Sequence, residues 1–142
     1  MRRLLIVLCL GLLVVPAFAQ GPMVPSAAVT STVYNGTTPL LPRFRLIDSS
    51  LADTEIVPAV SGFRIRVLAL HLTMTGTTVT LQFEDTTNGT KLTGAFQPTQ
   101  GQTIVLPFNP VGWFQTTAGD SLGLKQSGTQ SVDGSLVYVL VP

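Results

Sequence analysis

The chain has 142 residues, of which 45% are hydrophobic and 11% are charged, and its formal net charge is +1. This length predicts a single domain with additional segments, and the near-neutral charge provides no basic surface for nucleic acid or anionic lipid. The single cysteine rules out an intramolecular disulfide.

Residues 1–19 have the pattern of a secretory signal peptide. Arg2 and Arg3 form the positive region, residues 4–15 the apolar region, and Ala17-Phe18-Ala19 a small-x-small cleavage site before Gln20. An uncleaved membrane anchor is the alternative, although the apolar run is short for a spanning helix. We therefore expect a secreted, periplasmic or extracellular product with no membrane attachment after cleavage.

Cleavage would remove two of the eight basic residues and the only cysteine, which leaves six basic against seven acidic residues. Such a chain has no cross-link in a compartment that permits disulfides. Its stability must then come from packing, from a bound ion or from neighbouring subunits.

Residues 20–42 contain four prolines among small and polar residues, which predicts an extended arm. Within it, residues 28–34 are uncharged and have high strand propensity. This segment either stays loose or adds to a sheet edge, in the same copy or in a neighbouring one. Val29, Val33 and Tyr34 are the side chains expected to make such assembly contacts.

Residues 43–142 form the predicted β-domain, and residues 62–84 are its centre. They are expected to form two long strands joined by a tight turn at residues 75–77. In the first strand the apolar phase changes at Leu68, which indicates a β-bulge or a strand covered on both faces, and we favour the bulge. In the second strand Val79, Leu81 and Phe83 share one face, which predicts a sheet with one dry face.

The remaining strands are expected at residues 43–47, 55–60, 91–95, 103–108, 112–116, 121–126 and 134–141. The last is apolar on both faces, so we expect an inner strand. No segment has a convincing helical pattern. The sequence therefore predicts an all-β, two-sheet antiparallel sandwich of jelly-roll type, with an extended N-terminal arm.

The residues that carry enzyme chemistry are sparse, so we expect a non-enzymatic protein. His71 is the only histidine, lies within a predicted strand and is accompanied by no Gly-x-Ser-x-Gly motif. We expect it on a sheet surface or at an interface. Glu84 and Asp85 are adjacent and should point apart, which argues against paired catalytic carboxylates.

No metal or cofactor is predicted. Asp120 and Asp133 each neighbour a glycine, which is typical of turn residues. A calcium site built from loop carboxylates is the alternative, although residues 85–89 lack the spacing of an EF-type loop. Asn35 and Asn88 begin N-glycosylation acceptor patterns.

Trp113 and Phe114 are adjacent aromatic residues in a predicted strand. Neighbouring strand residues face opposite ways, so one is expected in the core and the other outside. The outer ring would either contact another subunit or form a platform for a glycan.

Several motifs in residues 61–142 resemble those of small β-sandwich proteins of tailed phages. They are residues 62–67 (GFRIRV), 92–94 (LTG), 106–107 (LP), 112–116 (GWFQT), 118–122 (AGDSL) and 132–138 (VDGSLVY). The similar proteins are head-decoration or fibre-like surface components. The resemblance implies a subunit without catalytic activity that assembles on a surface or with copies of itself.

The expected function is thus that of a secreted, non-catalytic structural or assembly subunit that forms a homo-oligomer or a surface assembly. The alternative is a secreted carbohydrate-binding or adhesion module that uses Trp113 or Phe114.

Overall fold

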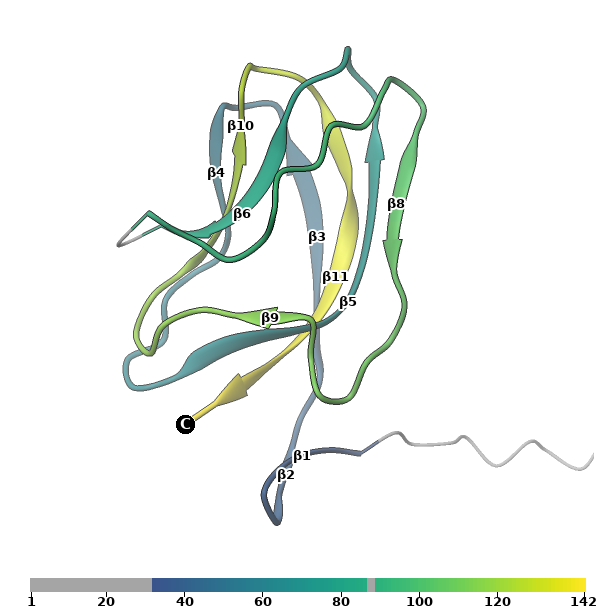
Figure 1. Cartoon of the computed structure of the whole chain (residues 1–142). Helices are drawn as coiled ribbons and strands as arrows, with labels where there is room; N and C mark the ends of the chain where they lie inside the picture. Colours follow the sequence, from purple (N-terminus) through teal and green to yellow (C-terminus); the bar gives the residue numbers. More distant parts are fainter. Residues whose placement is uncertain (1–31, 87–88) are drawn as a thin grey trace, which may run out of the picture.

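The computed structural model describes residues 32–86 and 89–142, which form strands and connecting loops (Figure 1). The predicted signal peptide, Val29 and Asn88 lie outside these residues. The described residues contain no helical segment with the length and hydropathy of a membrane span.

Two antiparallel sheets form the body of the domain. One contains β3 (Arg43–Ser49), β11 (Val132–Val141), β5 (Arg64–Met74) and β8 (Thr103–Leu106) in that order, with β9 (Phe114–Gln115) also paired to β5. The other contains β4 (Asp53–Val57), β10 (Leu122–Gln126), β6 (Leu81–Asp85) and β7 (Thr90–Lys91) in that order.

The chain passes repeatedly from one sheet to the other. The strands from β3 to β11 number eight when β8 and β9 are counted as one interrupted strand. Numbered in this way along the chain, they have the order 1-8-3-6 in one sheet and 2-7-4-5 in the other. This order is that of a jelly roll. The predicted all-β sandwich class is therefore confirmed.

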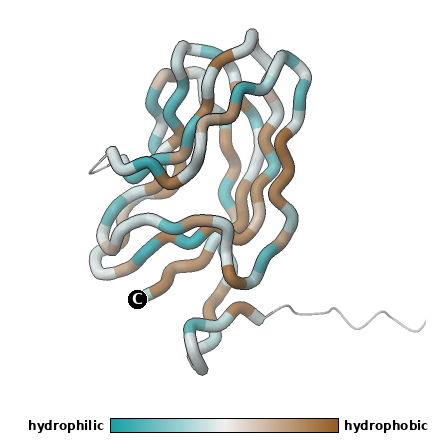
Figure 2. Tube along the Cα trace, in the orientation of Figure 1, coloured by the Kyte–Doolittle hydropathy of each residue, from teal (hydrophilic) through white to brown (hydrophobic). Residues whose placement is uncertain are grey.

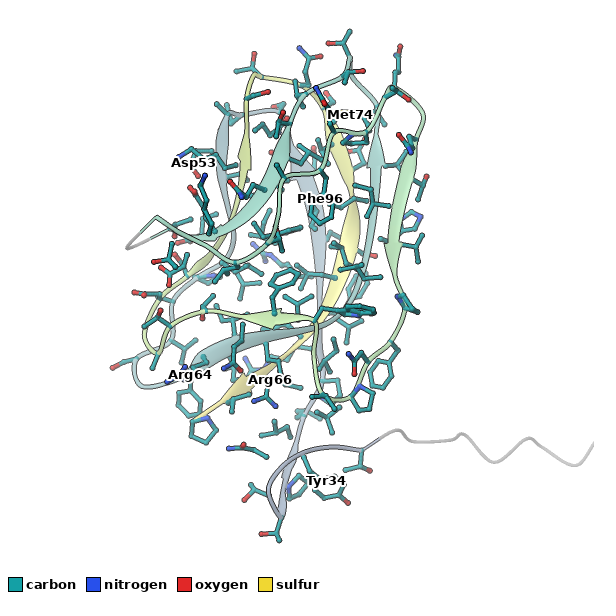
Figure 3. The ribbon with its side chains drawn as sticks, viewed as in Figure 1. Tyr34, Asp53, Arg64, Arg66, Met74 and Phe96 are labelled. Carbon is teal, nitrogen blue, oxygen red and sulfur yellow. The ribbon has the colours of Figure 1, made fainter. Side chains whose placement is uncertain are left out.

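The main core lies between the two sheets (Figures 1 and 3). Ile65, Leu72 and Leu136 enter it from the five-stranded sheet. Leu81 and Phe83 enter it from the four-stranded sheet. These residues are buried because the inner faces of the two sheets pack against each other, as the alternation in β6 indicates.

The predicted β-bulge is present in β5 at Leu68. The pairing of β5 with β11 shifts there, so that Val137 faces Ala69 while Tyr138 faces Val67. The extra residue reverses the side-chain phase, and both Val67 and Leu70 point into the main core. Leu68 itself belongs to a second cluster on the outer face of the five-stranded sheet.

The predicted hairpin of residues 62–84 is wrong. Its two strands, β5 and β6, lie in opposite sheets and do not pair with each other. The connecting backbone bonds elsewhere: the amides of Thr75 and Gly76 donate to the carbonyl of Ser131, each at 3.0 Å. The connection therefore crosses between the sheets and is held by the segment before β11.

The described part of residues 20–42 forms a short hairpin of β1 (Val33–Asn35) and β2 (Thr38–Leu40). Val33 is fully buried in the outer cluster with Leu68, Val139 and Val141. The hairpin thus covers part of the outer face of the five-stranded sheet. Tyr34 projects from it and is exposed (Figure 3).

As expected, β11 is an inner strand, and the outer cluster covers its outer face around Val139. It lies between β3 and β5, with Leu136 in the main core and Val139 in the outer cluster. Figure 2 shows that hydrophobic residues also continue along β8 at the edge of this sheet, where Val105 is exposed.

Candidate functional site

Trp113 lines a shallow depression of about 260 Å³ together with Arg66, Val111 and Gln115. The indole is 44% exposed, and its Nε1 donates to the carbonyl of Pro107 at 2.8 Å. The Arg66 Nε donates to the Gln115 Oε1 at 3.0 Å. This arrangement holds an aromatic ring beside fixed polar groups.

Gly112 allows this depression to form. Its φ is +93°, which favours glycine, and a Cβ at this position would meet the Arg66 side chain and approach the Val67 carbonyl. The turn therefore brings the backbone of Trp113 against β5, where the Trp113 amide donates to the Val67 carbonyl at 2.8 Å.

Phe114 faces the opposite way and packs in the main core. Its ring centroid is 5.1 Å from that of Phe83. The prediction that one aromatic residue of this pair lies inside and the other outside is confirmed. Trp113 is consequently the ring that can meet another molecule.

His71 is exposed on the outer face of the five-stranded sheet. It lies opposite Ser135 of β11 and Val105 of β8, and the three line a second depression of about 240 Å³. Its surroundings are mainly apolar, with Pro107 and Phe108 among the lining residues.

The loop of residues 107–113 brings the two predicted site residues, His71 and Trp113, to the same side of the molecule. Pro107 lines the depression at His71, and its carbonyl accepts the hydrogen bond from Trp113. The two depressions therefore lie next to each other along this loop.

Phe44 and Leu46 are exposed residues that the sequence reasoning missed. They point outward from β3 and are 64% and 68% exposed. A signal was present, because they alternate with Arg43 and Arg45 in the predicted strand. The pattern alone gave no means to decide which of the two faces is buried.

Of the two aspartates expected in turns, Asp120 directly follows a turn, whereas Asp133 lies within β11, so that prediction is wrong for Asp133. Glu84 is buried and pairs with Lys125 at 3.3 Å, and Asp85 is fully buried with its Oδ2 accepting from the Thr117 amide at 3.3 Å. Asp120 is also buried, while Asp133 is exposed and accepts from the Thr75 hydroxyl at 3.0 Å.

In residues 32–86 and 89–142, no group of three or more histidine, cysteine, aspartate or glutamate side chains is arranged to hold a metal ion.

No protein-family model matches the chain, and a search of curated proteins found no match.

Proposed function

We propose that the chain is a secreted, non-catalytic structural subunit that assembles with copies of itself or on a surface. The observation that carries the proposal is the apolar outer surface around His71, where Phe44 and Leu46 are more than half exposed. The largest apolar patch on a protein surface is often a contact site for another molecule.

Two further observations support this proposal. The jelly-roll fold occurs in viral capsid proteins as well as in lectins, so it suits an assembly subunit. The N-terminal region, for which a signal peptide is predicted, would direct the subunit to the cell exterior or periplasm. A decoration or shell component at an outer surface fits both observations and the resemblance to phage surface proteins.

The experiment is to recover the chain from the medium or periplasm and to determine its particle size by sedimentation velocity and electron microscopy. The proposal predicts particles larger than a single chain and a processed N-terminus. A single monomeric species at every concentration would contradict it.

A second function is favoured by the exposed indole of Trp113. An aromatic ring beside an arginine and a glutamine amide provides the stacking surface and the polar contacts that a sugar needs. In this case the protein is a carbohydrate-binding or adhesion module.

Glycan-array binding distinguishes this second function. Trp113→Ala should abolish binding, whereas Val111→Ala, at a 77% exposed residue of the same depression, should reduce it little. Absence of binding to every glycan, or equal loss in the two variants, would reject the module.

A further inference from the structure

The open face is the part of the outer surface of the five-stranded sheet that the β1–β2 hairpin leaves uncovered. Its exposed apolar side chains are Phe44 and Leu46 of β3, Val105 of β8 and Phe108. The register places Leu46, Ser135, His71 and Val105 in one row across the four strands. These side chains consequently form one surface.

The open face supplies much of the apolar area that a small contact between two copies needs. The four apolar side chains are 64%, 68%, 59% and 43% exposed. With full areas of about 150–200 Å² each, they expose about 400 Å² per copy. Two such surfaces bury about 800 Å² of apolar area, and polar neighbours would raise the total towards the roughly 1,200 Å² of small stable interfaces.

The charges at one end of the open face indicate an orientation. Asp48 and Asp133 lie directly opposite each other on β3 and β11, where like charges repel. Neither forms an ion pair within the described residues.

We infer that the open face is the docking surface for a second copy of this chain, packed face to face about a two-fold axis perpendicular to the strands. This orientation keeps the two acidic ends apart. The opposite orientation would gather four carboxylates in one place. The inference rests on the proposed function and names the surface that performs it.

The first test compares two substitutions at exposed leucines by light scattering after gel filtration. Leu46→Lys places a charge in the open face of both copies, and the dimer dissociation constant should rise about 100-fold or more. Leu51→Lys is the matched control, because Leu51 is 60% exposed but lies in the turn between β3 and β4. It should leave the dimer unchanged.

Urea unfolding of both variants serves as the folding control. Leu46 is largely exposed, so neither substitution should move the unfolding midpoint of the separated chain. If Leu46→Lys and Leu51→Lys associate like the unchanged chain, the inference about the open face is wrong while assembly through another surface stands. If the unchanged chain is monomeric, the proposed function itself fails.

The second test addresses the orientation by removing a charge. Asp48→Asn should leave the dimer dissociation constant nearly unchanged, because the two acidic ends lie apart in the inferred orientation. A clearly tighter dimer would overturn the orientation, since it would show that the carboxylates of the two copies meet.

The chain's own residues 20–31 are the competing occupant of the open face. If the unchanged chain is monomeric and removal of these residues induces association, they cover the face and the inference of a second copy is overturned.

Discussion

Val33→Ala tests whether the β1–β2 hairpin belongs to the folded body. Val33 is fully buried with Leu68, Val139 and Val141. The substitution removes two methyl groups, each contributing about 0.8 kcal/mol, and leaves a small cavity. We expect a loss of about 2 kcal/mol in the free energy of unfolding.

The assay is urea unfolding followed by the fluorescence of Trp113, the only tryptophan. A loss of this size corresponds to a midpoint lower by about 1–2 M urea. Tyr34→Ala is the control, because the neighbouring Tyr34 is exposed and should change the stability by less than about 0.5 kcal/mol. Equal midpoints for the two variants would refute the docking of the hairpin on the sandwich.

Three further predictions follow from the structure. Gly134→Ala should lower the free energy of unfolding, measured in urea, by at least about 1–3 kcal/mol, because the new Cβ would collide with the backbone of β5. Gly94→Ala is the control and should have little effect, because a Cβ at Gly94 would lie in open space. Gln126→Ala should lower the free energy of unfolding by about 1–3 kcal/mol in the same assay, since the buried Ser49 hydroxyl would lose the hydrogen bond that the Gln126 amide donates at 3.0 Å. An unchanged unfolding midpoint would show that this bond contributes nothing to stability. Intact-mass measurement of the exported protein should find a chain that begins at residue 20, and a full-length mass would contradict cleavage after residues 17–19.

The position of the hairpin also changes how the N-terminal region should be tested. Removal of residues 20–42 would delete Val33 together with its contacts and expose Val139 and Val141. Loss of assembly in such a deletion would not separate a missing contact from a damaged fold. A deletion that ends at residue 31 leaves the hairpin in place and is the informative one.

Local patterns predicted most of the fold. The phase change at Leu68 identified the bulge, and the two apolar faces of residues 134–141 identified an inner strand. The adjacent positions of Trp113 and Phe114 predicted that one ring lies outside and the other in the core. Each of these depends on the two-residue period of a strand, which a sequence displays directly.

The pairing of strands was harder to predict because it depends on distant segments. The turn after β5 has the composition of a tight hairpin, but Gln130 and Ser131, more than 50 residues later, bind its backbone instead. The burial of Glu84 likewise depends on Lys125 of β10, which no local pattern reveals. For the same reason the sequence indicated His71 and Trp113 as candidate contact residues, but it did not predict that the loop of residues 107–113 places both on the same side of the molecule.

The central claim, that the protein acts by assembling through its surface, is tested most directly by sedimentation equilibrium of the exported chain. Measured from about 1 to about 100 µM, the average mass should rise above that of one chain with increasing concentration. An average mass equal to one chain over the whole range would contradict the claim.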